Sequence, residues 1–240
     1  TKSGPGVYLE EHLKGVDTKV KKSYESLSDK ANTIKNPTKR KEAKNIIKAL
    51  LGLVKTGIRS EEVNRLSKSN IVYSKKEGWY IDFGVGEKGD ISLPIKPIGK
   101  KNTPPGVLPI SESLANHLLN MPTKDAKSPI FNKDYTLGGR AIKNQIAEAV
   151  FGEGYTWTSV RTLLRTVAKT KGISKEKMYD YMRRKGDIEE VGGKQVAATE
   201  ASYIELSPEQ SVKIQKQTMK ELGIGGDVDV QFLQPLQAVI

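Results

Sequence analysis

The side chains of this sequence that are best suited to chemistry are two arginines, a tyrosine and a few lysines. Arg59 follows the residues T-G-I, Arg161 follows T-S-V, and Tyr203 lies in the stretch A-T-E-A-S-Y-I-E. When a nucleophile attacks a phosphodiester, negative charge builds on the non-bridging oxygens, and planar guanidinium groups can hold those oxygens without a metal ion. A tyrosine hydroxyl becomes a better nucleophile where clustered cations favour the phenolate. Two arginines and a tyrosine brought together could therefore bind a phosphodiester and attack it.

The residue types that are absent or scarce exclude several other chemistries. There is no cysteine, so disulfides, thiolate zinc sites and cysteine nucleophiles are excluded. The two histidines, His12 and His117, are far apart in the sequence and neither lies in a nucleophile motif. A histidine-based metal centre or catalytic triad is therefore not expected. We expect no metal and no cofactor, with Arg, Lys, Tyr and the carboxylates carrying any reaction.

The charge balance indicates a polyanionic partner. Lys and Arg number 40 against 28 Asp and Glu, a formal net charge of +12 over 240 residues. The first candidates for such a partner are nucleic acid and an anionic membrane face. Among nucleic acids we expect double-stranded DNA, contacted by Arg40, Lys100 and Lys101. No apolar run approaches the roughly 20 residues needed to span a bilayer, so membrane insertion is not predicted. We expect an intracellular protein, cytoplasmic or nucleoid-associated.

The elements that must position these residues are mostly helical. Residues 1–40 are rich in Lys, Ser, Thr and Asn and predict a basic arm, or a short helix and a linker, broken at Pro37. Apolar residues at three- and four-residue steps predict a helix from Glu42 to about Lys55, ended by Gly57, and a short helix follows from Ser60.

Between residues 70 and 110 the chemistry changes to β-formers and turn residues, which predict a small sheet of two or three strands. Helices are expected over 111–121, 140–151, 158–171 and 175–184. A capping box and a proline at 207–210 predict a last helix ending near Gly223. The expected fold is mainly α with a small antiparallel β-sheet, an α+β class. The domain plan is an arm over 1–40, a catalytic domain over 41–223 and an apolar docking tail over 224–240.

The ordered set of motifs resembles the tyrosine recombinase and integrase family. The residues T-G-I-R with Glu62 three positions on are similar to the family's T-G-x-R-x-x-E box, and T-S-V-R falls where the family has H-x-x-R. The resemblance implies that Arg59 and Arg161 are the two catalytic arginines and that Thr158 stands at the box histidine. It also implies that Tyr203 is the nucleophile.

The remaining catalytic roles come from the same resemblance, which covers roughly residues 42–223. Lys194, nine residues before Tyr203, stands where the family usually has His or Trp. The family places a general-acid lysine on a β-hairpin, which implies Lys88 here, with Lys100 and Lys101 as alternatives. The implied activity is site-specific cutting and rejoining of DNA through a 3′-phosphotyrosyl bond. The resemblance also implies a homo-oligomer on DNA, joined through the C-terminal tail.

Each of these residues also has a plainer interpretation. Arg59 could be an ordinary helix-end cation, Thr158 a helix N-cap, Tyr203 a core aromatic and Lys194 a loop cation. The same chemistry also serves type IB topoisomerases and telomere resolvases. A rival of another class is a basic DNA-binding protein without catalysis, whose arginines contact phosphates only.

Overall fold

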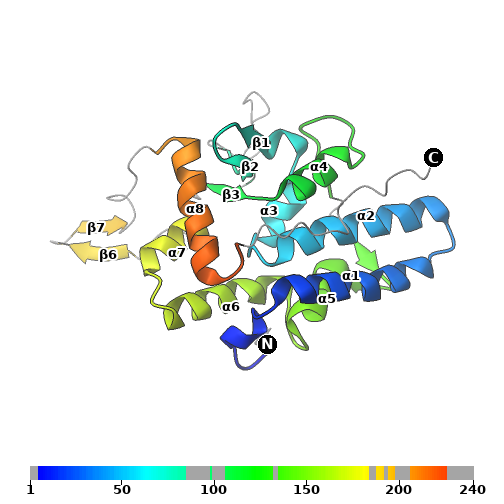
Figure 1. Ribbon diagram of the computed structural model, residues 1–240, viewed down its shortest axis with the longest axis horizontal. Coiled ribbons are helices and arrows are strands. Elements are labelled where there is room, and N and C mark those ends of the chain that lie inside the picture. Colours follow the sequence, from blue (N-terminus) through cyan, green and yellow to red (C-terminus); the bar gives the residue numbers. More distant parts are fainter. Residues whose placement is uncertain are drawn as a thin grey trace.

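The computed structural model describes residues 5–84, 98, 106–131, 135–183 and 206–225, and for 188–191 and 194–197 it describes the backbone. The chain is mainly helical with small antiparallel sheets, as the sequence predicts (Figure 1). The helices are α1 Val16–Asn32, α2 Pro37–Val54, α3 Ser60–Arg65, α4 Glu112–Asn120, α5 Ile142–Phe151, α6 Trp157–Thr170, α7 Lys175–Tyr181 and α8 Pro208–Leu222, with 3-10 turns η1 Glu10–His12 and η2 Lys68–Asn70. The strands are β1 Ile71–Ser74, β2 Gly78–Asp82, β3 Val107–Pro109, β4 Thr136–Leu137, β5 Arg140–Ala141, β6 Ile188–Val191 and β7 Lys194–Ala197.

The segment expected to be an arm or short helix forms a 17-residue helix, α1, which lies beside α2 (Figure 1). Its buried apolar residues fall on one face and join the same core as those of α2: Val16, Val20, Leu27 and Ala31. Those positions recur at four- and seven-residue steps, the spacing of an amphipathic helix, which the polar composition of the segment concealed. The local prediction of an arm is therefore corrected.

Helix α2 begins at Pro37, five residues before the predicted start. Asn36 is its N-cap, and the Asn36 side chain accepts a hydrogen bond from the backbone N–H of Lys39 at 3.1 Å. Proline suits the first helical position because its missing N–H would have no partner there. The supposed helix breaker is thus a helix start, and the predicted apolar face of α2 is buried as expected: Ile46, Ile47, Leu50, Leu51 and Val54.

The predicted small sheet is present. Its order is β1-β2-β3, antiparallel throughout, with Tyr73 opposite Trp79 and Ile81 opposite Leu108. Ile81 and Leu108 are fully buried in the main core, so the sheet packs its inner face onto the helices. Two further hairpins, β4 with β5 and β6 with β7, were not expected from the sequence.

Of the two helix caps expected in the C-terminal part of the chain, that of α8 is confirmed and that of α6 is corrected. Ser207 caps α8 as predicted, and α8 ends at Gly223, whose φ of 79° is left-handed. Helix α6 is capped by Thr156 rather than Thr158, because the Thr156 side chain accepts a hydrogen bond from the backbone N–H of Ser159 at 3.2 Å. Ile224, the first residue of the expected tail, is buried in the core, and the tail from residue 226 lies outside the described residues. Within the described part of the chain, no helix has the length and apolar character to cross a membrane.

Candidate active site

Arg59 lies at the junction between α2 and α3 and is fixed by the loop around it. The Thr56 hydroxyl donates to the carbonyl oxygen of Leu53 and accepts from the N–H of Ile58, which closes the end of α2. Arg59 is the N-cap residue of α3, and its backbone N–H donates to Glu62 Oε2 at 2.9 Å. Its guanidinium donates to Glu62 Oε1 at 2.9 Å, so the carboxylate of Glu62 holds both the backbone and the side chain of Arg59.

Arg161 projects from α6 toward the same loop. Its Nη1 donates to the carbonyl oxygen of Gly57 at 2.6 Å, and the indole N–H of Trp157, one turn earlier, donates to the carbonyl oxygen of Ile58 at 2.8 Å. Helix α6 is therefore attached at two points to the loop that carries Arg59. The two boxes singled out in the sequence form one local structure.

The guanidinium groups of Arg59 and Arg161 converge on consecutive residues. Arg59 Nη2 donates to the carbonyl oxygen of Arg183 at 2.9 Å, and Arg161 Nη2 donates to that of Met182 at 2.9 Å. With its bond to Glu62 or Gly57 included, each guanidinium uses two of its five N–H donors. The other three have no partner among the residues that the structure describes, and both side chains are only partly buried. Two cations with donors to spare therefore lie side by side.

A third arginine, Arg183, completes the cluster and was not predicted from the sequence. Its Nη2 and Nε donate to the two oxygens of Glu62 at 2.8 and 3.1 Å, and its guanidinium lies over the ring of Phe83 at 3.7 Å. The side chain is only 2% exposed. Nothing in the sequence distinguishes Arg183 from other basic residues, because its partners lie on segments far away in the chain.

The charges in the cluster act on one another. Burial acts to raise the pKa of Glu62, but the charges of Arg183 and Arg59 outweigh it and lower that pKa to about 2. Burial lowers the pKa of Arg161 to about 9, and the charges of Arg183 and Arg59 act in the same direction. At neutral pH the cluster thus holds three cations and one anion. An anion that accepts hydrogen bonds from the remaining N–H groups would balance this excess of positive charge.

Tyr181 is the tyrosine closest to this cluster among the described contacts, and its hydroxyl is occupied. The hydroxyl donates to the carbonyl oxygen of Thr56 at 2.8 Å, and the side chain is 1% exposed. Burial raises the pKa of Tyr181 well above its usual value, although the charges of Arg183 and Arg161 act to lower it. Tyr181 therefore supports the Thr56 loop and is poorly suited to attack a phosphate.

The other predicted site residues are placed as follows. Thr158 is exposed in the first turn of α6. Arg40 lies in the first turn of α2, roughly 20 Å along the helix from the Arg59 loop, and donates to the carbonyl oxygens of Ile34 and Lys35 at 2.9 and 3.4 Å. Lys194 begins β7, of which the structure describes the backbone. The remaining predicted residues lie outside the described residues: Tyr203, Lys88, Lys100 and Lys101.

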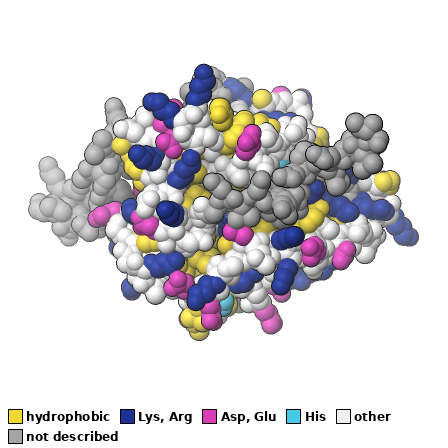
Figure 2. All heavy atoms as spheres, viewed as in Figure 1, with side chains coloured by type: hydrophobic (Ala, Val, Ile, Leu, Met, Phe, Trp, Pro, Cys, Tyr) yellow, Lys and Arg dark blue, Asp and Glu magenta, His cyan; other side chains and the backbone are white. Residues whose placement is uncertain are grey.

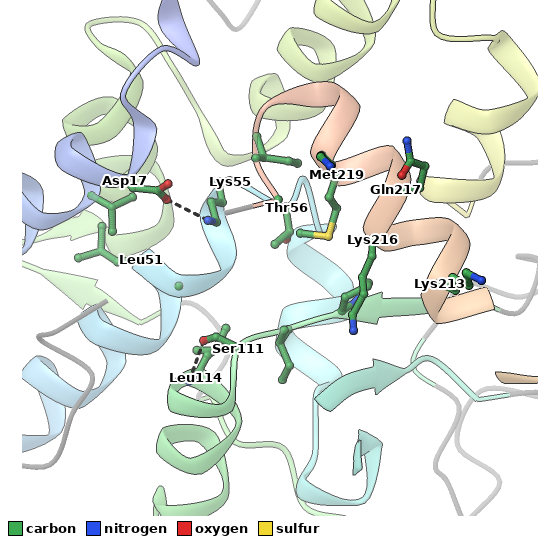
Figure 3. Close-up of a pocket in the computed structure, with 17 residues that line it drawn as sticks. Asp17, Leu51, Lys55, Thr56, Ser111, Leu114, Lys213, Lys216, Gln217 and Met219 are labelled. Atoms are coloured by element: carbon green, nitrogen blue, oxygen red, sulfur yellow. Dashed lines mark hydrogen bonds and ion pairs between the residues drawn. The ribbon is translucent and has the colours of Figure 1, made fainter. Parts of the chain in front are cut away.

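A separate cavity of about 390 Å³ lies between α2, α4 and α8 (Figure 3). Its lining includes the apolar residues Leu51, Leu114 and Met219, and α8 also contributes Lys213, Lys216 and Lys220. Lys55 also lines it and pairs with Asp17 at 2.9 Å. Neither Arg59 nor Arg161 lines this cavity. The described residues hold no cluster of His, Asp and Glu that could bind a metal ion.

Comparison of the chain with protein-family models gave no match, and neither did comparison with curated proteins or with solved structures. The geometry of the arginine cluster and the residue types in the sequence are therefore the basis for assigning a function.

Proposed function

We propose that the chain cuts and rejoins DNA through a covalent tyrosine intermediate, in the manner of tyrosine recombinases. The observation that supports the proposal is the convergence of Arg59 and Arg161. They come from distant parts of the chain. Among the described residues, three N–H donors of each have no partner and no carboxylate pairs with Arg161. Two such guanidinium groups match the non-bridging oxygens of one phosphodiester.

In the proposed reaction Arg59 and Arg161 hold the scissile phosphate while Tyr203 attacks the phosphorus. The phenolic oxygen gives its proton to solvent water as the new P–O bond forms, and the bond from phosphorus to the 5′ oxygen breaks. Lys88 gives a proton to the leaving 5′ oxygen, and Lys194 donates to a non-bridging oxygen. The 5′ hydroxyl can later attack the phosphotyrosine and restore the DNA, because the covalent bond preserves the energy of the broken one. Neither a metal nor a nucleotide takes part in these steps.

The surface of the protein suits DNA as the substrate. Lys and Arg side chains are spread over the face seen in Figure 2, in keeping with the net charge of +12. Strand exchange between two duplexes is the favoured outcome, with protomers joined through the apolar residues 227–240. Topoisomerase and telomere resolvase activities use the same chemistry, and the products separate them: recombinant joints, relaxed circles or hairpin ends.

A second candidate function is DNA binding without catalysis. Two observations favour it: Thr158 is exposed where the recombinase family has its histidine, and the two arginines donate to backbone carbonyl oxygens in the described structure. In this case the arginines would contact phosphates without breaking a bond. Both functions predict DNA binding, and only the first predicts a covalent adduct.

The test is covalent capture of DNA. The protein is incubated with a pool of nicked duplexes of random sequence, in which cleavage releases a short fragment and prevents rejoining, and the products are separated on a denaturing gel. Wild-type protein is expected to form a covalent adduct and Tyr203→Phe none, with equal DNA binding in a gel-shift assay. Tyr73→Phe is the control, because Tyr73 is 57% exposed on β1. DNA binding by the wild type without any adduct would favour the second function, and an adduct in Tyr203→Phe would assign another nucleophile.

A further inference from the structure

Arg183 occupies a backbone position that normally suits glycine. Its φ of 51° is the one left-handed value among the non-glycine residues that the structure describes. The left-handed region is sterically unfavourable for a residue with a Cβ. Glycine would relieve that strain, so the arginine side chain must supply something that offsets it.

The contacts of the Arg183 side chain are all internal. In addition to its hydrogen bonds to Glu62, its guanidinium donates from Nη1 to the carbonyl oxygen of Tyr181 at 3.1 Å and stacks on the ring of Phe83. Its stem lies against Gly106, where a Cβ would come within 2.6 Å of Arg183 Cγ. Burying a charge is unfavourable unless its hydrogen bonds are well made, and here they are. Arg183 is held on every side and cannot reach a substrate.

Glu62 links Arg183 to Arg59. Glu62 Oε1 accepts from Arg59 Nη1 and Arg183 Nε, and Oε2 accepts from the Arg59 backbone N–H and Arg183 Nη2. Arg183 thus fixes the orientation of the carboxylate that fixes Arg59. It also shares the negative charge of Glu62, so this one carboxylate does not fully neutralise Arg59.

The backbone turn at Arg183 links the cluster to Arg161 as well. The left-handed conformation ends α7 and leaves the carbonyl oxygens of Met182 and Arg183 to accept from Arg161 and Arg59. The Arg183 side chain, acting through Glu62, and the Met182–Arg183 turn therefore restrain both guanidinium groups that the proposed function needs.

We infer that Arg183 is a positioning residue, which holds Glu62 and the Met182–Arg183 turn so that Arg59 and Arg161 bind one phosphate group together. This inference rests on the proposed function for the identity of the phosphate, a DNA phosphodiester. The phosphate-binding step itself can be measured with no DNA cleavage.

The experiment measures binding of inorganic phosphate by NMR, from the arginine Nε–H signals of the full chain. The signals are assigned with Arg59→Lys and Arg161→Lys. Arg183→Lys keeps the charge but loses the planar fork, so phosphate affinity is expected to fall at least about tenfold. Arg140→Lys is the matched control, because Arg140 is exposed and pairs with Glu148 at 2.7 Å. A thermal unfolding curve for each variant separates lost affinity from lost folding.

Glu62→Gln is the second variant, in case Arg183→Lys does not fold. It keeps the shape of Glu62 but cannot accept the same four hydrogen bonds, and the same loss of affinity is expected. In the wild type, the Arg59 and Arg161 signals should shift together as phosphate is added. A weaker response in Arg183→Lys and Glu62→Gln, with no change in Arg140→Lys, supports the inference whether or not the protein cleaves DNA. Phosphate affinity within twofold of wild type in a folded Arg183→Lys or Glu62→Gln would overturn it, as would a wild type whose two signals do not respond to phosphate. The proposed function has its own test, the covalent adduct.

Discussion

Arg161 donates a hydrogen bond of 2.6 Å to the carbonyl oxygen of Gly57, the residue that turns the chain from α2 toward Arg59. Gly57 has a φ of 68°, and a Cβ there would lie 2.7 Å from Leu164 Cδ1 on α6. The missing side chain thus lets α6 approach the Arg59 loop closely enough for Arg161 to bond to it. This contact, together with the hydrogen bond from Trp157 to Ile58, couples the T-G-I-R sequence to the distant T-S-V-R sequence.

Gly57→Ala is expected to destabilise the protein. The left-handed backbone costs an alanine about 1–2 kcal/mol, and the clash adds about 1–3 kcal/mol where the buried Leu164 side chain has no room to shift. Gly138→Ala is the control, because Gly138 has a φ of 59° but nothing within 4 Å of its Cβ position. Urea unfolding should show a larger loss for Gly57→Ala than for Gly138→Ala. Equal losses would mean that α6 does not press against the loop.

Replacing Arg59 or Arg161 with lysine is expected to reduce DNA cleavage far more than DNA binding. Lysine keeps the charge but cannot present two parallel donors to a phosphate, and removal of such donors generally costs on the order of 10² in rate. Single-turnover adduct formation and a gel-shift titration measure the two effects separately. Arg140→Lys should behave as wild type. Full cleavage activity in both Arg59→Lys and Arg161→Lys would remove these residues from the site.

Much of the fold could be predicted from the sequence, and the failures have physical causes. Helix α8 was predicted from Ser207, Pro208 and Gln210, because capping is a local interaction between near neighbours. The start of α2 at Asn36 and Pro37 was misinterpreted, because the same two residues can break a helix or begin one. The full length of helix α1 was not predicted, because lysines and other polar residues separate its buried residues, and their burial depends on α2 and α5 packing against it.

The candidate site could be predicted only in part. Arg59, Glu62 and Arg161 were found because they lie in short motifs, and the structure brings them together. Arg183 was not found, since its role depends on contacts with Glu62 and Phe83 that no local pattern encodes. The expected roles of Tyr203, Lys88 and Lys194 remain predictions.

The stability of the protein is expected to depend on Glu62 at acidic pH. The pKa of Glu62 is about 2 in the folded protein against 4.5 in a free side chain, because Arg183 and Arg59 outweigh the effect of burial. Its folded pKa is depressed, so its contribution is present above pH 4.5 and is lost as the pH falls toward 2. Between pH 7 and pH 3 the wild type should therefore lose on the order of 2 kcal/mol more unfolding free energy than Glu62→Gln. Urea unfolding of both proteins at the two pH values measures the difference, and parallel losses would show that the carboxylate is not paired as described.

DNA affinity is expected to fall steeply as salt concentration rises. A chain with a net charge of +12 that binds a duplex releases counterions, and each neutralised phosphate contributes about −0.9 to the slope of log affinity against log salt. Arg161→Met removes one phosphate contact in the proposed site and should make the slope less negative by about one unit, whereas Arg161→Lys should leave it unchanged. Arg165→Met is a matched control, because Arg165 is exposed on the same helix. Fluorescence anisotropy with a labelled duplex over a range of salt concentrations gives the slopes. A wild-type affinity that does not vary with salt would contradict binding along the phosphate backbone, and equal slopes for the wild type and Arg161→Met would show that Arg161 does not contact a phosphate.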